Sequence, residues 1–161
     1  ERRLFQSGGS PVLLGGDTLR AGLNGDLGFS AKDRSENVRR LAEVAAHLAR
    51  NGHIAIVAAV SPSTEDRAAA RRIAGDLFRE IYIATPADVC ESRDPKGHYA
   101  KARAGNLNGF TGIGNDYEAP HASELTIDTS HRAIADATGD ITRMLSRTGV
   151  LLDTVADLAA S

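Results

Sequence analysis

Short apolar runs alternate with amphipathic segments along most of the chain. Four of these runs have the length of β-strands and are predicted as strands at 11–14, 53–61, 80–85 and 124–129. The second run, HIAIVAAVS, is almost continuously apolar, so we expect it to be buried on both faces of a sheet. Strands that alternate with helices indicate crossover units, and they predict a parallel sheet covered by helices on both sides.

The longest amphipathic segment follows the first predicted strand. Ser30, with Asp33 three residues later, predicts a capped helix start, and Gly52 predicts the end of that helix. The apolar positions that fall on one face of this helix are Val38, Leu41, Val44 and Leu48. This face is therefore expected to pack against the sheet.

Other helix signals are shorter. Ser63, with an acid three residues later, predicts a capped helix over 67–75, and Thr85 is predicted as an N-cap followed by Pro86 in the first turn. The first residues, ERRLFQSGG, are typical of a helix that ends at Gly8. Helical spacing reappears from residue 130 onward, and we expect a terminal helix followed by a tail.

One long segment interrupts this alternation. Residues 93–120 are rich in glycine and charge and show only a short helical pattern at 99–104. A loop of this length inside a compact domain is usually either a functional lid or a disordered connection. Glycine hinges beside Lys96, Lys101 and Arg103 favour a lid that closes over an anionic ligand, and a solvated flexible loop is the alternative.

Size and charge narrow the class of protein. The 161 residues are enough for one domain with a substantial core, and no apolar run approaches the roughly 18 residues of a membrane span. A formal net charge of −2 gives no field of one sign that would attract nucleic acid or a membrane, so any anion site must be local. A single cysteine and a charged first segment favour a cytoplasmic protein.

Candidate chemistry lies after the predicted strands, since ligands of open parallel sheets bind beyond their carboxyl ends. Asp17 follows the first strand, where a substrate hydroxyl or a Mg²⁺ shell could meet it, and the alternative is a turn residue that caps a helix over 18–23. Five histidines show no ligand-like spacing, which argues against zinc. Cys90 lies on a predicted helix and is interpreted as a small buried residue rather than a nucleophile.

Three polar residues and one aromatic surround the start of the long helix. Arg34 and Asn37 are an i, i+3 pair, and they meet Arg20 only if the intervening loop folds back. Guanidinium groups suit phosphate and sulfate, although an isolated arginine at a helix start is more often a solvated surface charge. Phe29 is either a hydrophobic staple onto the first helical turn or an exposed platform on which a base stacks.

Several motifs together resemble the adenylyl-sulfate kinase family. The matching segments are GDTLRAGLNGDLGFSAKDRSENVRR, EVAAHLARNGHIAIVAAVSPSTEDR, IYIATPADVCESRDPKGHYAKARAGNLNGFTGI and YEAP, in the family's order over residues 16–120. The resemblance implies a three-layer α/β fold of the P-loop nucleoside-kinase type. It also implies transfer of the γ-phosphoryl of ATP to the 3′-hydroxyl of adenylyl sulfate, with ATP and Mg²⁺ as cofactors.

The same resemblance implies roles for individual residues. Asp17 would handle Mg²⁺ and activate the attacking hydroxyl, and Ser61 matches a serine described in the family as a phosphoserine intermediate. The adenylyl-sulfate pocket would comprise Arg20, Phe29, Arg34, Asn37 and Val60. The matched lid residues that would close on the nucleotide are Lys96, Gly109 and Phe110, with Lys101 and Arg103 near phosphates.

Two departures from the family pattern lead to further expectations. The sequence contains no Gly-x-x-x-x-Gly-Lys-Ser/Thr segment, and Gly15 stands where the family has the first acid of its Asp-Gly-Asp loop. Because phosphoryl transfer depends on such a loop for positioning and charge, we expect the residues to belong to a longer polypeptide and not to turn over alone. Residues 1–149 would form the kinase domain and 150–161 a tail.

Alternatives remain at this level. One is a catalytically inactive relative that binds adenylyl sulfate, with Gly15 as the mark of lost activity. Another is a kinase for a different small acceptor, such as a nucleoside or shikimate. A homodimer and a fusion or association with ATP sulfurylase are further expectations from the family.

Overall fold

The computed structural model of the chain describes residues 1–106, 111 and 117–149. Within them lie four strands and seven α-helices, with one short 3₁₀ helix. The strands are β1 (Pro11–Gly15), β2 (Ile54–Ala58), β3 (Ile81–Ile83) and β4 (Leu125–Ile127). The helices are α1 (Arg2–Gln6), α2 (Gly16–Arg20), α3 (Ala31–Arg50), α4 (Thr64–Ala74), η1 (Gly75–Leu77), α5 (Ala87–Arg93), α6 (His98–Arg103) and α7 (Ile134–Arg147).

The strands pair in parallel, as the alternation of strands and helices predicted. β1 pairs with β2 from Pro11 opposite Ile54 to Gly15 opposite Ala58, and β3 pairs with β4 from Ile81 to Ile83. In the described residues these are two separate two-stranded ladders, β1–β2 and β3–β4, rather than one continuous sheet. Asp17 follows the carboxyl end of β1, and Val60 and Ser61 follow the carboxyl end of β2.

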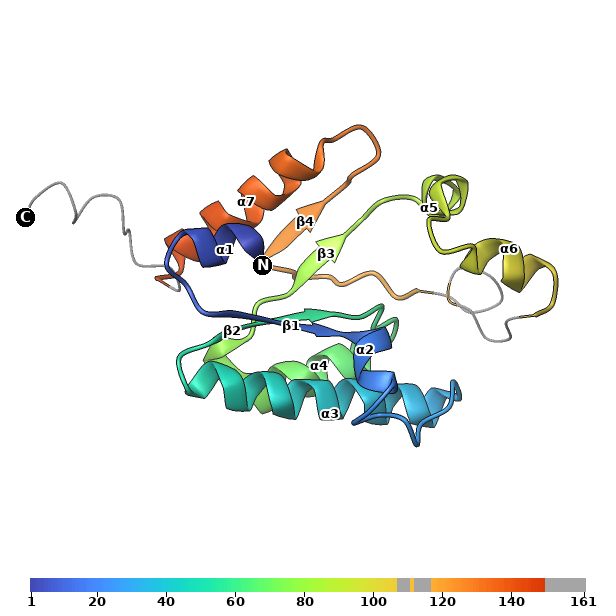
Figure 1. Cartoon of the computed structure of the whole chain (residues 1–161), viewed down its shortest axis with the longest axis horizontal. Helices are drawn as coiled ribbons and strands as arrows, with labels where there is room; N and C mark the ends of the chain where they lie inside the picture. The colour runs from blue at the N-terminus through green and yellow to red at the C-terminus, as the bar shows by residue number, and fades with distance from the viewer. Residues whose placement is uncertain (107–110, 112–116, 150–161) are drawn as a thin grey trace, which may run out of the picture.

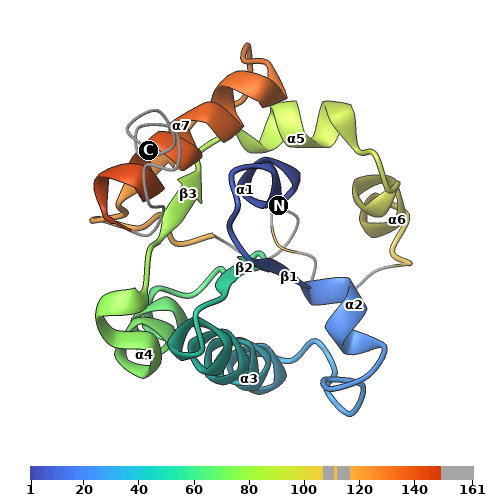
Figure 2. The same ribbon diagram turned by 60° about the vertical axis from the view of Figure 1, so that its left-hand side comes forward.

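Helices lie on both sides of the strands and give three layers. Figure 1 shows α3 and α4 beneath β1 and β2, with α1 and α7 on the opposite side, and Figure 2 shows the same separation with α5 beside α7. Val38, Ala42 and Ala70 form a buried cluster between α3 and α4, against which Ile73 and Phe78 pack. No helix among the described residues is long and apolar enough to cross a membrane.

Several sequence predictions about helix ends are confirmed. Ser30 caps α3, because its Oγ accepts a hydrogen bond from the Asp33 N–H at 3.2 Å. Ser63 caps α4 in the same way through the Asp66 N–H at 3.4 Å. Gly52, which follows α3, has a φ of 84°, a backbone conformation that glycine adopts without strain.

Two predictions are wrong in detail. Thr85 is not the N-cap of α5, which begins at Ala87 with Pro86 as its N-cap. The Thr85 hydroxyl instead accepts a hydrogen bond from the Thr129 N–H at 3.0 Å, because the carboxyl ends of β3 and β4 are adjacent. β2 is not buried on both faces at its carboxyl end, where Val57 is 42% exposed. A strand is buried only where other elements cover it, and this end of β2 opens toward the loop of Val60.

Candidate functional site

Asp17 lies in the first turn of α2, directly after β1. It caps no helix, since the N-cap of α2 is Gly15 and no side chain bonds to that helix start. Its Oδ2 instead accepts a hydrogen bond from Lys96 Nζ at 2.7 Å. This bond and the charge of Lys96 hold the pKa of Asp17 below its ordinary value. Asp17 is therefore an exposed, ionised carboxylate rather than the capping residue of the alternative interpretation.

Arg20 and Phe29 form a stacked pair across the loop between α2 and α3. The Arg20 guanidinium lies 4.4 Å from the centroid of the Phe29 ring, and its Nη1 donates to the Leu27 and Gly28 carbonyls at 3.0 Å each. Phe29 is 59% exposed. Its partner position in a hydrophobic staple would be Arg34, which is not apolar. The structure therefore agrees with an exposed platform and not with a staple.

Arg34 links this loop to the long segment after α6. Its Nε donates to the Phe29 carbonyl at 3.1 Å, and its Nη1 donates to Thr111 Oγ1 at 3.0 Å, 77 positions along the chain. The loop between α2 and α3 thus folds back, as a shared pocket requires. Arg20 and Arg34 both contact the residues around Phe29.

Asn37 lies one turn further along α3 and is 8% exposed. Its Oδ1 accepts a hydrogen bond from Asn24 Nδ2 at 2.9 Å. Asn24 is fully buried, and its own Oδ1 has no hydrogen-bond partner within the described part of the chain. The buried amide of Asn24 holds the side chain of Asn37 in place next to the loop of Arg20 and Phe29.

The turn after β2 carries Val60 and Ser61. Val60 is 62% exposed. Ser61 has a φ of 43°, which lies in the left-handed range. Such a conformation is uncommon for a residue with a Cβ and occurs often at functional sites.

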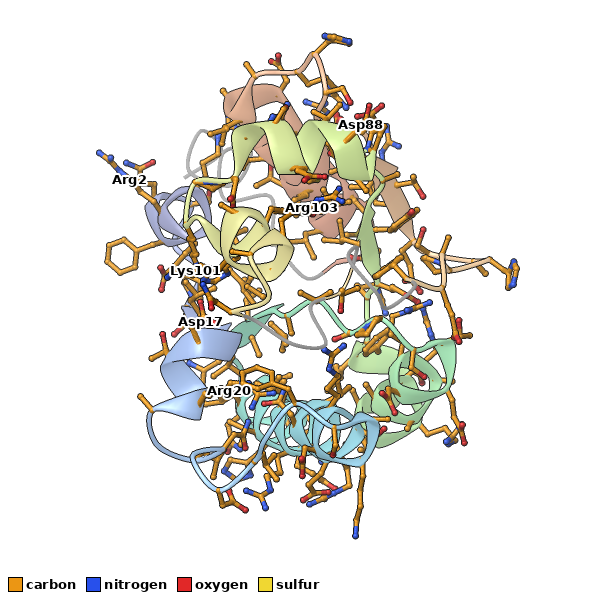
Figure 3. All side chains as sticks on the ribbon, turned by 90° about the vertical axis from the view of Figure 1, so that its right-hand side faces the viewer. Arg2, Asp17, Arg20, Asp88, Lys101 and Arg103 are labelled. Atoms are coloured by element: carbon orange, nitrogen blue, oxygen red, sulfur yellow. The ribbon has the colours of Figure 1, made fainter. Side chains whose placement is uncertain are left out.

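The cations of the predicted lid differ in their surroundings. Arg103 makes two hydrogen bonds to the Glu91 carboxylate, at 2.8 and 2.9 Å, and this contact lowers the pKa of Glu91. Lys101 is exposed and makes no ion pair with any described residue. Figure 3 labels Asp17, Arg20, Lys101 and Arg103 and shows α2 and α6, which carry them, on the side that faces the viewer. The predicted lid residues Gly109 and Phe110 lie outside the described residues.

Three contributing residues were missed from the sequence. Asn24 and Thr111 lie in loops where no periodic pattern singles out one polar residue. Arg67 is 8% exposed on α4 and contacts the Ser61 turn. A signal for Arg67 existed, since it precedes the buried Ala70 by three residues and therefore shares its helix face.

These residues can bind an anionic ligand that also carries an aromatic ring. Arg20, Arg34 and Lys96 supply positive charge, Phe29 supplies a ring face, and Asp17 supplies one ionised carboxylate. They lie beyond the carboxyl ends of parallel strands, where α/β proteins bind ligands. The fold and the site together define an α/β protein of the nucleoside-kinase type.

Comparison with known proteins narrows this class. A family model described as adenylylsulphate kinase matches residues 1–128. The chain belongs to the adenylyl-sulfate kinase family, which confirms the resemblance seen in its motifs.

Three relatives illustrate the match. An adenylyl-sulfate kinase of Clostridium acetobutylicum is 50% identical over 129 residues, which are 80% of this chain and 64% of that protein. One of Shewanella baltica (strain OS185) is 49% identical over 136 residues, 84% of this chain and 66% of that protein. The solved structure of the Mycobacterium tuberculosis APS kinase in complex with AMPPNP and APS has a TM-score of 0.87 and 46% identity, covering 91% of this chain and 86% of that one.

The matched region is shorter than the two curated relatives. The chain spans just under two thirds of their length. The family and the fold are therefore shown for this chain, whereas the activity of the whole protein is a separate question.

Proposed function

We propose that the full-length protein is an adenylyl-sulfate kinase, which transfers the γ-phosphoryl of ATP to the 3′-hydroxyl of adenylyl sulfate. The observation that carries this proposal is the arrangement of Arg20, Phe29 and Arg34, with Thr111 of the lid hydrogen-bonded to Arg34. It supplies two guanidinium groups and a ring face at one place, which suits an adenine nucleotide with a phosphosulfate group. The M. tuberculosis relative, solved with AMPPNP and APS, supports the same ligands.

Asp17 and Lys96 suit the phosphate side of this reaction. Mg²⁺ in such sites is held by one or two carboxylates together with substrate phosphates. Asp17 is ionised and exposed and fits that role, although the described residues contain no cluster of three metal-binding side chains. Mg²⁺ when bound would neutralise phosphate charge. Asp17 would also orient the attacking hydroxyl, and Lys96 would exchange Asp17 for a phosphate oxygen.

The remaining predicted residues complete the proposed pocket. Val60, Ser61 and Asn37 would line the acceptor side, and Gly109, Phe110, Lys101 and Arg103 would belong to the lid. In-line phosphoryl transfer needs no covalent intermediate, so we favour a pocket-lining role for Ser61 over a phosphoserine role. If the Ser61→Ala variant still transfers phosphate, Ser61 lines the pocket. If the variant binds adenylyl sulfate but transfers no phosphate, the phosphoserine role is favoured.

Gly15 favours one alternative function, a non-catalytic relative that binds adenylyl sulfate. The carboxylate expected at this position is missing, which leaves Asp17 as the only acid between residues 11 and 20. The domain boundary at residue 149, a homodimer, an association with ATP sulfurylase and a cytoplasmic location also stay proposals.

Two measurements on the full-length protein separate these functions. A coupled assay with MgATP and adenylyl sulfate should show turnover, and isothermal titration should show binding of adenylyl sulfate. Binding without turnover would favour the non-catalytic relative. Turnover with a nucleoside or shikimate, and not with adenylyl sulfate, would refute the proposed acceptor.

A further inference from the structure

Arg67 is a buried cation near the site that the proposed reaction leaves without a role. It is 8% exposed and lies in the first turns of α4. Its Nε lies 2.8 Å from Glu80 Oε1 as an ion pair, although this contact is not aligned as a hydrogen bond. Its side chain is thus charge-compensated inside the protein and cannot reach a ligand directly.

The two Nη atoms of Arg67 make four hydrogen bonds. Nη1 donates to the Ser61 carbonyl at 2.8 Å and to the Pro62 carbonyl at 3.1 Å. Nη2 donates to Thr64 Oγ1 at 3.1 Å and to the Glu118 carbonyl at 2.6 Å. These bonds use the four N–H groups of the two Nη atoms, more than the three donors of a lysine can supply.

Two of these contacts hold the turn after β2 in its unusual conformation. Ser61 has a positive φ of 43°, and the carbonyls of Ser61 and Pro62 point to the same nitrogen of Arg67. A left-handed conformation of a non-glycine residue persists only where its surroundings hold it. Arg67 is the side chain that does so here, next to the exposed Val60.

The contact with Glu118 ties the end of the lid segment to the same turn. The Glu118 N–H donates to the Pro62 carbonyl at 3.0 Å, and its carboxylate accepts the Thr64 N–H at 2.6 Å. The Arg67 guanidinium also lies 5.3 Å from the ring centroid of Tyr117, which stacks on Tyr82 of β3 at 5.6 Å. One buried side chain therefore contacts the Ser61 turn, the start of α4 and residues 117–118, which precede β4.

We propose that Arg67 is a positioning residue that couples the Ser61 turn of the acceptor pocket to residues 117–118, near the end of the predicted lid segment. This inference rests on the proposed function, because it assigns the turn to the pocket for adenylyl sulfate. The position of residues 117–118 and the shape of the acceptor pocket then depend on the same guanidinium.

The test is Arg67→Lys in the full-length protein, with Arg71→Lys as the matched control. Arg71 lies one turn along the same helix, pairs with Glu124 and Glu80, and stacks on Phe78. Within the described ranges, no hydrogen bond or ion pair joins it to the Ser61 turn or to Glu118. Loss of hydrogen bonds to a buried charged group should raise the KM for adenylyl sulfate about tenfold in Arg67→Lys. The KM for MgATP should change by less than about twofold, and both KM values of Arg71→Lys should stay near wild type.

A second readout does not depend on activity. Amide hydrogen exchange at residues 63–64 and 117–118 should be faster in Arg67→Lys than in Arg71→Lys. The reason is that both segments lose their hydrogen bonds to the Arg67 guanidinium. Equal exchange in the two variants would overturn the inference even if wild type is an active kinase. Wild type that neither binds nor phosphorylates adenylyl sulfate would instead overturn the proposed function.

Glu118→Ala keeps the experiment decisive if Arg67→Lys does not fold. Glu118 is exposed, and this change removes the carboxylate bond to the Thr64 N–H while the carbonyl that accepts from Arg67 remains. It should raise the KM for adenylyl sulfate in the same direction but by a smaller factor. An unchanged KM in Glu118→Ala, or an equal loss for both substrates, would contradict coupling between the turn and the lid.

Discussion

Gly15 occupies a position that can accept a side chain. Its φ is −79°, and among the described residues a Cβ there would meet only Thr18, with Oγ1 at 3.4 Å and Cβ at 3.9 Å. We expect Gly15→Asp to fold normally and to lower the Mg²⁺ concentration for half-maximal activity about threefold to tenfold. The reason is that a second carboxylate near Asp17 attracts the cation by a few kcal/mol at most. Activity of the full-length variant titrated with Mg²⁺ measures this.

Gly15→Asn is the matched control, because it has nearly the same shape without the charge. It should leave the Mg²⁺ dependence as in wild type. If Gly15→Asp and Gly15→Asn behave alike, charge at this position does not contribute to the site.

The ion pair of Lys96 with Asp17 leads to a prediction about protonation. The pKa of Asp17 is lowered chiefly by its hydrogen bond to Lys96, so Asp17 stays ionised to a lower pH than a free aspartate. Lys96→Met should therefore raise the pKa of Asp17 toward its ordinary value and move the acid limb of the activity profile to higher pH. A carboxyl-detected NMR titration of Asp17 measures the shift.

Lys101→Met provides the comparison for this titration. It removes another lid cation, one that makes no ion pair with the described residues. The pKa of Asp17 should stay at its wild-type value in this variant. An equal rise in both variants would mean that the general positive field of the lid, and not the Lys96 contact, sets the protonation of Asp17.

Some residues of the candidate site could be selected from the sequence because the signals that point to them are local. Asp17 directly follows a predicted strand, and Arg20, Phe29 and Arg34 belong to one sequence motif. The position after the strand and the motif therefore indicate the same region of the chain. Asn24, Arg67 and Thr111 act through partners 13, 51 and 77 positions away, and such contacts exist only once the chain has folded. Periodicity alone indicates a face of a helix and not the partner that lies on it.

At the scale of elements, the helix starts at Ser30 and Ser63 were predictable because capping is a contact within one turn. Thr85 was misassigned, since a contact across strands with Thr129 competes with capping and depends on the pairing of β3 with β4. The exposed end of β2 was missed for a similar reason. An apolar run gives no information about which of its residues other elements cover.

The short ladder of β3 and β4 is fastened at its amino end by Glu124. Its carboxylate accepts two hydrogen bonds from Arg71, at 2.6 and 3.0 Å, and a third from the Glu80 N–H at 2.6 Å. We expect Glu124→Gln to lower the free energy of unfolding by about 1 kcal/mol at neutral pH, a modest value because Arg71 is partly exposed to solvent. Urea denaturation measures the difference.

The pH dependence of this effect has a definite sign. Arg71 lowers the pKa of Glu124 to about 2, so its stabilisation is complete above the ordinary pKa of glutamate and is lost as pH falls toward 2. The difference in unfolding free energy between wild type and Glu124→Gln should therefore shrink on acidification. Glu43→Gln is the control, since the ion pair of Glu43 in the described structure is an exposed contact with Arg39 at 3.5 Å. A difference that is independent of pH would show that the carboxylate charge does not matter.

At the scale of the whole molecule, two contacts join residues of the predicted lid to the first third of the chain. Lys96 reaches Asp17 and Thr111 reaches Arg34, across 79 and 77 positions of sequence. The layered parallel fold could be predicted from the alternation of strands and helices, since it follows from rules of connection. The division into two ladders could not, because strand order is set by packing between distant segments.

The contact between Arg34 and Thr111 leads to a prediction about how adenylyl sulfate stabilises the full-length protein. A ligand at about 100 times its Kd adds about 2.7 kcal/mol to the folded state. For a domain of this size, adenylyl sulfate should therefore raise Tm by roughly 5–10 °C. In Arg34→Ala this shift should be largely lost at the same ligand concentration, because the guanidinium that joins the Phe29 loop to Thr111 is gone. Thermal unfolding with and without adenylyl sulfate measures both shifts.

Arg39→Ala separates this effect from a general change in helix α3. Arg39 lies on the same helix, and its ion pairs within the described part of the chain are with Glu36 and Glu43. The shift in Tm caused by adenylyl sulfate should therefore remain as in wild type. Shikimate and unphosphorylated nucleosides carry no anionic phosphosulfate for Arg34 and should give little shift in any variant. A full shift in Arg34→Ala would place the acceptor elsewhere, because a ligand that does not contact a side chain gains nothing from its presence.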